Sequence, residues 1–101
     1  MRQFLLNLSD SLKVALCQVS NMQYGTYIEA FPDFRVKVQR IQDRREKEFR
    51  FVFFKQEGDQ EKTIFETQSS NKQDLIDSLN DTLLEKILLA KFQQEGIESR
   101  Q

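Results

Sequence analysis

The chemistry open to this chain is limited first by the residue types it lacks. Among its 101 residues there is no histidine and a single cysteine, Cys17. Histidine is the commonest general base and metal ligand, and a thiolate metal site needs several cysteines. The three glycines, Gly25, Gly58 and Gly96, stand far apart, so no glycine-rich phosphate-binding loop is present. We therefore expect a protein that is not an enzyme and that holds no metal ion or cofactor.

Four carboxylates in the last third of the chain recur every three or four residues. They are Asp74, Asp77, Asp81 and Glu85. Side chains at this spacing lie on one face of a helix, where ion pairs and solvation are common. We interpret them as a solvated helix face with capping charges, and not as the acid–base pair that glycoside hydrolysis would need.

Basic residues concentrate in the middle of the chain, and seven of them could bind an anion together. They are Arg35, Lys37, Arg40, Arg44, Arg45, Lys47 and Arg50. On one surface they could bind a phosphoinositide head group, an anionic membrane or a single-stranded nucleic acid, because each cation near a membrane contributes about 1 kcal/mol. The alternative is that Asp43, Glu46 and Glu48 neutralise them on an ordinary solvated sheet face.

A nucleic-acid site would also need exposed aromatic side chains that stack on bases. The candidates near the basic residues are Tyr24, Tyr27 and Phe31. Packing in a core or loop explains these three residues equally well, so the sequence leaves both interpretations open.

The overall composition indicates one domain without a strong electrostatic field. Fifteen basic and sixteen acidic residues give a net charge of -1, and 39% of the residues are hydrophobic. Residues 1–101 therefore form a single expected domain. Cys17 lies in an apolar run and is expected to be buried, in a reducing compartment. The apolar stretch at residues 4–8 is too short for a signal peptide or a membrane span, so we expect a cytoplasmic protein, with peripheral membrane association as a further option.

The elements that would position these residues begin with mostly β patterns over residues 1–69. Phe4, Leu6 and Leu8 alternate with other residues, and the polar residues 9–11 favour a turn, so residues 4–19 are predicted as a hairpin. A short helix over residues 12–19 is the alternative. The elements expected next are a loop at 20–25, strands at 26–29, 34–39, 49–54 and 63–67, a turn at 30–33, a polar connection at 42–48, and a turn at 56–59 in which Gly58 adopts a positive φ.

The last third predicts one amphipathic helix over residues 70–95, followed by a tail at 96–101. The polar residues 70–73 match a capping box, and Gly96 marks the expected end. One buried stripe is expected from Ile76, Leu79, Leu83, Ile87 and Ala90. In the second half the apolar surface is widened by Leu84, Leu88, Leu89 and Phe92.

Such a helix is longer than a small sheet can cover. About 25 residues at 1.5 Å each reach ~37 Å, so the end should extend past the sheet. We expect Leu84, Leu88, Leu89 and Phe92 to contact a second copy or a protein partner there, since exposed apolar patches of this kind mark interaction sites. The alternative is that the N-terminal residues fold back over the helix.

Residues 51–84 resemble the last strands and terminal helix of pleckstrin-homology domains. The order is an apolar strand, a turn, a strand ending in small polar residues, and a capped helix. Residues 73–79 look like the family's helix signature, with Leu75 where a tryptophan is usual. Residues 4–15 are similar to the middle hairpin of such domains in guanine-nucleotide exchange factors. The family's basic lipid-binding motif, in its first hairpin, has no counterpart here.

The expected fold class is therefore α+β, with an antiparallel β-sheet or roll closed by a long C-terminal amphipathic helix. The resemblance implies a noncatalytic interaction or adaptor module. The sequence predicts binding to a protein partner or self-association through the helix. The alternative function is binding of an anionic membrane or a nucleic acid through the basic residues.

Overall fold

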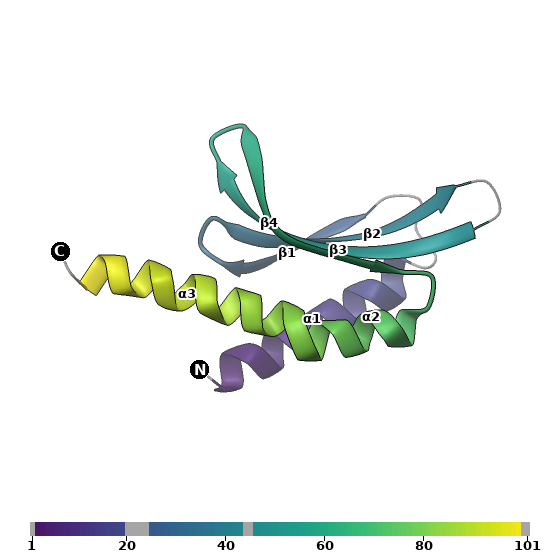
Figure 1. Cartoon of the computed structure of the whole chain (residues 1–101), viewed down its shortest axis with the longest axis horizontal. Helices are drawn as coiled ribbons and strands as arrows, with labels where there is room; N and C mark the ends of the chain where they lie inside the picture. Colours follow the sequence, from purple (N-terminus) through teal and green to yellow (C-terminus); the bar gives the residue numbers. More distant parts are fainter. Residues whose placement is uncertain (1, 20–24, 44–45, 100–101) are drawn as a thin grey trace.

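The computed structural model describes the backbone of residues 2–19, 25–43 and 46–99. Helix α1 (Arg2–Val19) is followed by strands β1 (Thr26–Phe31), β2 (Phe34–Asp43), β3 (Glu46–Glu57) and β4 (Gln60–Ser69). The C-terminal helical segment consists of α2 (Lys72–Ser78), the π-helical turn η1 (Leu79–Leu83) and α3 (Leu84–Ser99). The strands form one layer and the helices a second layer on one face of the sheet (Figure 1).

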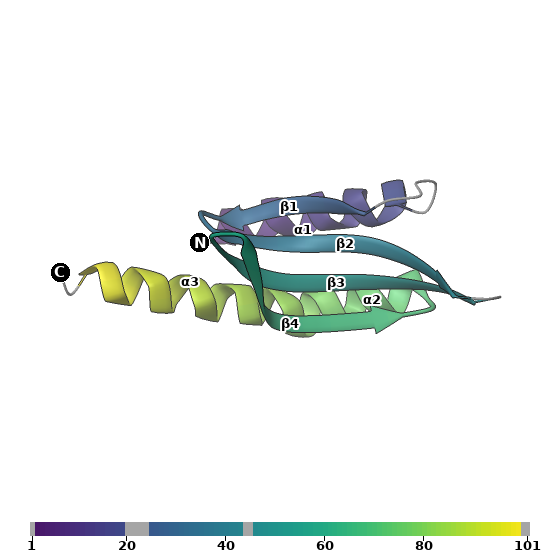
Figure 2. The ribbon, with the colours of Figure 1, turned by 90° about the horizontal axis from the view of Figure 1, so that it is seen from above.

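The four strands form an antiparallel sheet in the order β1-β2-β3-β4. This confirms the predicted α+β class with an antiparallel sheet and a C-terminal helix. The sheet is open and is not closed into a barrel or roll (Figure 2). Gly58 has the predicted positive φ, 61°, in the two-residue turn between β3 and β4. The strands on either side of residues 44–45 are longer than predicted, because the pairing of β2 with β3 extends to Asp43 and Glu46. Most of the polar connection that was expected at 42–48 is therefore strand.

The prediction of an N-terminal hairpin at residues 4–19 is wrong, because this segment is the continuous helix α1. Leu8, Leu12, Leu16 and Val19 are buried against the sheet at three- or four-residue spacing. The alternation of Phe4, Leu6 and Leu8 suggested a strand, but the helical stripe buries more apolar surface. The segment that resembles the middle hairpin of pleckstrin-homology domains is therefore helical in this chain.

The helical geometry also corrects the position of two polar side chains in α1. Cys17 was expected to be buried, but it is exposed, because the helix turns it away from the sheet while its neighbour Leu16 faces the core. Ser9 was expected in a turn, but it is buried in α1. Its hydroxyl donates a hydrogen bond to Oδ1 of Asn80 at 3.4 Å, so α1 is linked to η1.

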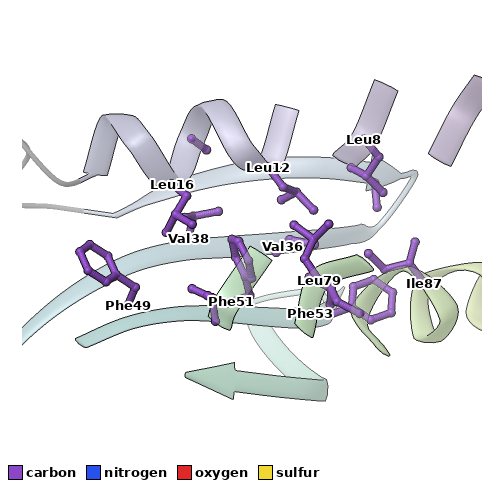
Figure 3. Packing of buried hydrophobic residues seen from close by; sticks show 14 of the residues in the cluster. Leu8, Leu12, Leu16, Val36, Val38, Phe49, Phe51, Phe53, Leu79 and Ile87 are labelled. Atoms are coloured by element: carbon purple, nitrogen blue, oxygen red, sulfur yellow. The ribbon is translucent and has the colours of Figure 1, made fainter. Parts of the chain in front are cut away.

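The core lies between the helices and one face of the sheet. Side chains from α1, β2, β3 and the C-terminal helices point toward one another in this layer (Figure 3). The residues with no exposed surface include Leu12, Leu16, Val36, Val38, Phe51, Phe53, Leu79 and Ile87. Burial of each such side chain stabilises the fold by about 1.5–3 kcal/mol relative to an exposed position. This core fixes α3 to the sheet through its first turns.

The C-terminal helical segment starts and ends differently from the prediction. Asn71, and not Ser70, is the N-cap, and its Oδ1 accepts a hydrogen bond from the Gln73 N–H at 2.8 Å. The helix continues through Gly96 to Ser99, so the predicted stop is wrong. A glycine in a helix costs only about 1 kcal/mol relative to alanine and does not end it by itself.

The π-helical turn η1 explains why residues four apart stay buried along this segment. Leu75, Leu79, Leu83 and Ile87 all face the core. In a regular α-helix each four-residue step rotates by about 40°, so such a stripe would drift away from the sheet. In η1 the Leu84 N–H donates to the Leu79 carbonyl, a five-residue separation that adds one residue to the turn. The wider turn corrects the drift and keeps α3 aligned with the core.

Candidate functional site

The end of the β3–β4 hairpin bends away from the helices (Figure 1). The bend coincides with a bulge, because Phe53 pairs with Phe65 and Phe54 with Thr63, so Ile64 has no partner on β3. A bulge of this kind kinks a strand and increases its twist. It also makes the edge strand β4 a poor template for pairing with another chain.

The bent hairpin end packs over the sheet face that is opposite the helices. Phe54 points to this face and has no exposed surface, and its ring contacts Tyr27 edge-on at a centroid distance of 5.9 Å. Nζ of Lys37 on β2 forms an ion pair with Glu61 on β4 at 3.2 Å. Since β3 lies between β2 and β4, this pair requires β4 to reach over the open face. Packing therefore holds the hairpin end in its bent position.

A groove of about 420 Å³ opens between the bent hairpin and α3, and we call it the distal groove. Its volume lies within the range of ligand-binding pockets. It is lined by Phe34, Lys55, Glu57, Lys62, Ile64, Lys86, Leu89, Ala90, Gln93 and Gln94. Phe34 is buried at its base, whereas Ile64 and Leu89 expose 41% and 52% of their surface. The groove thus combines a closed apolar base with two open apolar walls.

The charges that line the distal groove are mainly positive. It has three lysines and one carboxylate, that of Glu57. Nζ of Lys55 is 3.9 Å from a Glu57 oxygen and 5.6 Å from the centroid of the Phe34 ring. Neither Lys62 nor Lys86 forms an ion pair with a side chain that the structure describes. These two exposed ammonium groups, on β4 and α3, give the groove its excess positive charge.

The predicted partner-binding residues form a strip along α3. Leu84 and Leu88 are half-buried, whereas Leu89 and Phe92 each expose 52% of their surface. Their three- and four-residue spacing makes them neighbours on the helix surface. Of the four, Leu89 lines the distal groove. Along the strip, the side chains therefore become more exposed, from Leu84 at the edge of the core to Phe92 on the surface.

The overhang expected from helix length is present, and the N-terminal helix covers part of α3. Figure 2 shows α3 continuing past the sheet and past α1. Near the start of α1, the ring of Phe4 lies beneath Lys91, whose Nζ is 5.1 Å from the ring centroid. The same ammonium group is 5.4 Å from the Phe31 ring and pairs with Glu95 at 3.2 Å. α1 thus packs beside α3 without covering Leu89 or Phe92.

The seven basic residues predicted to bind an anion are not gathered on one surface. Strand register places Arg35, Lys37 and Arg50 on the open face, because they align with Phe54, Val52 and Gln39. Arg40 aligns with Phe49, which is buried on the helix face of the sheet. Lys47 is two residues from Phe49 in β3 and so points to the same face. Arg44 and Arg45 lie outside the described residues.

The cations on the open face are balanced by carboxylates on neighbouring strands. Lys37 pairs with Glu61, and Nε of Arg50 is 3.0 Å from Glu66. Arg35 aligns with Glu29 across β1 and β2. The open face therefore has little net charge with which to attract a phosphate backbone.

Of the three aromatic residues considered for base stacking, Tyr27 is on the open face and exposes 51% of its surface. Its ring is 5.6 Å from Nζ of Lys37. Phe31 is buried and stacks on Phe34 at 4.4 Å, so it is not available to a base. Tyr24 lies outside the described residues. One exposed ring next to neutralised cations is a weak basis for binding nucleic acid.

The carboxylates Asp74, Asp77, Asp81 and Glu85 are all exposed along the C-terminal helical segment. This confirms their interpretation as a solvated face. The described residues contain no cluster of three or more histidine, cysteine, aspartate or glutamate residues that could hold a metal ion. In the described part of the chain, no helix is long and apolar enough to span a bilayer.

Sequence reasoning missed the residues that face α3 across the distal groove. Lys55, Lys62 and Ile64 were assigned only to a hairpin, and Lys86 only to a helix. One signal was available in β4, where Ile64 and Phe65 are consecutive apolar residues in an otherwise polar strand. Neighbouring residues of a regular strand point to opposite faces, so two adjacent apolar residues are compatible with a bulge.

Comparison of the chain with known proteins finds no matching family model, no matching curated protein and no matching solved structure.

Proposed function

We propose that this chain is a noncatalytic protein-interaction module that binds a protein partner, or a second copy of itself, through the distal part of α3. The observation that carries the proposal is the exposure of Leu89 and Phe92, at 52% each, on a helix that is anchored in the core and extends past its sheet. The adjoining distal groove adds Ile64 to the same apolar region.

A few large apolar side chains would supply most of the binding free energy. Full burial of such a side chain from a fully exposed state contributes about 1.5–3 kcal/mol, so burial of the 52% that Leu89 and Phe92 each still expose would contribute roughly half of that. Interfaces commonly draw most of their affinity from a small central group of this kind. Leu89 and Phe92 are three residues apart and so can enter one interface together.

The absence of histidine from the sequence and the exposed, dispersed carboxylates of the helical segment support a noncatalytic role. We also propose a cytoplasmic location. A pleckstrin-homology-like type of module remains a prediction, supported by the order of β3, turn, β4 and capped α2.

The alternative function, binding of an anionic membrane or a nucleic acid through the basic residues at 35–50, has less support. Among its described members, Arg40 and Lys47 are on the other face of the sheet from Arg35, Lys37 and Arg50. Lys37 and Arg50 are ion-paired on the open face.

Size-exclusion chromatography with light scattering, together with site-specific photo-crosslinking in cell extract, tests the proposal. A photoreactive residue at position 89 or 92 should crosslink to a second copy or to a protein, and Leu89→Glu with Phe92→Glu should abolish the association. Leu6 is a matched control, because it exposes the same fraction, 52%, on α1. A strict monomer whose position 89 crosslinks no more than position 6 would contradict the proposal.

A further inference from the structure

We infer that the distal groove binds an acidic amphipathic segment of a partner protein, with apolar side chains inserted between Ile64 and Leu89 and carboxylates paired with Lys62 and Lys86. The inference rests on the proposed function and adds the chemistry of the partner. It depends on the shape of the groove, on its charge and on the rigidity of the hairpin that forms one wall.

The shape of the groove suits apolar anchors. Phe34 and Ala90 lie at its base, one from β2 and one from α3. Ile64 and Leu89 stand on opposite walls and remain largely exposed in the isolated chain. An inserted aliphatic or aromatic side chain would contact both walls and remove both from water.

The positive charge of the groove favours a partner segment with negative charge. Lys55 already has Glu57 nearby, whereas Lys62 and Lys86 form no ion pair with a described side chain. The two lysines come from the two walls, so a segment lying along the groove would have a cation on each side. The whole chain has a net charge of only -1, so this excess is local and does not follow from the composition. Complementary charges at an interface favour specificity and fast association.

The hairpin wall is held open by contacts on its other face. If it closed onto α3, Phe54 would lose its burial against Tyr27 and the Lys37–Glu61 ion pair would break. Both contacts lie on the face away from the groove. The groove is therefore present before a partner arrives, which lowers the entropic cost of binding.

Two exposed surfaces of a second copy are poor occupants of the groove, namely the acidic row of the C-terminal helical segment and the helix α1. The acidic row is formed by Asp74, Asp77, Asp81 and Glu85. The structure describes all of residues 70–88, and none of them is a large exposed apolar residue. On α1, the exposed residues Leu6 and Val14 are accompanied by only one carboxylate, Asp10. Neither surface supplies both apolar anchors and several carboxylates.

Selection of random peptides of about twelve residues on the full-length chain tests the inference without a known ligand. The charge variant is Lys62→Glu with Lys86→Glu. A matched control is Arg35→Glu with Lys47→Glu, which changes the net charge equally but outside the groove. Lys62→Gln with Lys86→Gln is a milder second variant, and circular dichroism shows which variants are folded.

The enriched peptides should have a net negative charge and at least two large apolar residues. Their affinity should fall about tenfold or more in the Lys62/Lys86 variants, fall at higher salt, and change little in the control. Enrichment of neutral or basic peptides, no enrichment, or equal loss in the control would overturn the inference.

The experiment also separates this inference from the proposed function. If peptide affinity falls when Leu89 is substituted but not when Lys62 and Lys86 are, the partner is not acidic. α3 is then still the interaction surface. Peptides whose affinity is unchanged by substitution of Leu89, Phe92, Lys62 and Lys86 would reject both the acidic partner and the proposed function of α3. Self-association that blocks peptide binding would show that a second copy is the occupant and would overturn the inference.

Discussion

Ile64 of β4 and Leu89 of α3 form opposite walls of one groove, although one lies in an edge strand and the other in the last helix. Ile64 is the bulge residue that has no partner on β3, and Leu89 belongs to α3, the helix that continues past the sheet (Figure 2). The groove exists because a kink in the sheet and an overhang of the helix occur at the same end of the molecule.

Phe54→Ala should destabilise the fold as strongly as a substitution in the main core. Phe54 has no exposed surface, although it lies on the face opposite the helices. Loss of a buried phenylalanine ring typically costs about 3–5 kcal/mol of unfolding free energy. Urea denaturation measures this cost, with Ile64→Ala as a control that should cost much less. A loss under 1 kcal/mol for Phe54→Ala would show that the bent hairpin is not packed against the sheet.

Lys37 and Glu61 should show a measurable coupling free energy. Lys37→Glu and Glu61→Lys should each lower the unfolding free energy, and the double exchange should restore part of the loss. The side chains are 20% and 37% exposed, so we expect a coupling of about 0.5–1 kcal/mol at low salt. A double-mutant cycle by urea denaturation measures it. Purely additive effects would mean that β4 does not reach over β2 in solution.

Leu89→Glu and Phe92→Glu should leave the stability of the monomer nearly unchanged. Both side chains are half exposed, so we expect a change within about 0.5 kcal/mol. Ile87→Ala, on the same helix but with no exposed surface, should cost about 2–5 kcal/mol. Thermal and urea unfolding at low protein concentration compare the three variants. A large loss in the first two variants would show that these side chains stabilise the monomer itself.

Binding to anionic liposomes or to single-stranded DNA should be weak and insensitive to charge reversal on the open face. Arg35→Glu with Arg50→Glu should change cosedimentation little, because both cations align with or pair with glutamates there. The pair Arg44→Glu and Arg45→Glu, outside the described residues, is the informative comparison. Strong binding that falls steeply with salt and with either double variant would support the anion-binding alternative.

Some parts of the fold could be predicted because the local pattern allowed one interpretation. The alternation of Phe34, Val36 and Val38 with polar residues is compatible with a strand and not with a helix. The C-terminal helix has a polar cap and a long apolar stripe. The N-terminal segment was ambiguous, because its apolar residues fit both periods. Packing of Leu12 and Leu16 against the sheet decided in favour of the helix.

The sequence by itself determined the antiparallel strands, the C-terminal helix and its excess of apolar surface, because these follow from periodicity and length. Only the tertiary structure decided where on the molecule this exposed apolar surface lies. Strand register separated Arg40 and Lys47 from Arg35 and Arg50, and so dispersed a cluster that is compact in sequence. The bulge at Ile64 and the packing of Phe54 turned the hairpin away from α3, so Lys62 and Lys86 line one groove from its two sides. These contacts join residues far apart in the chain, and no local pattern encodes them.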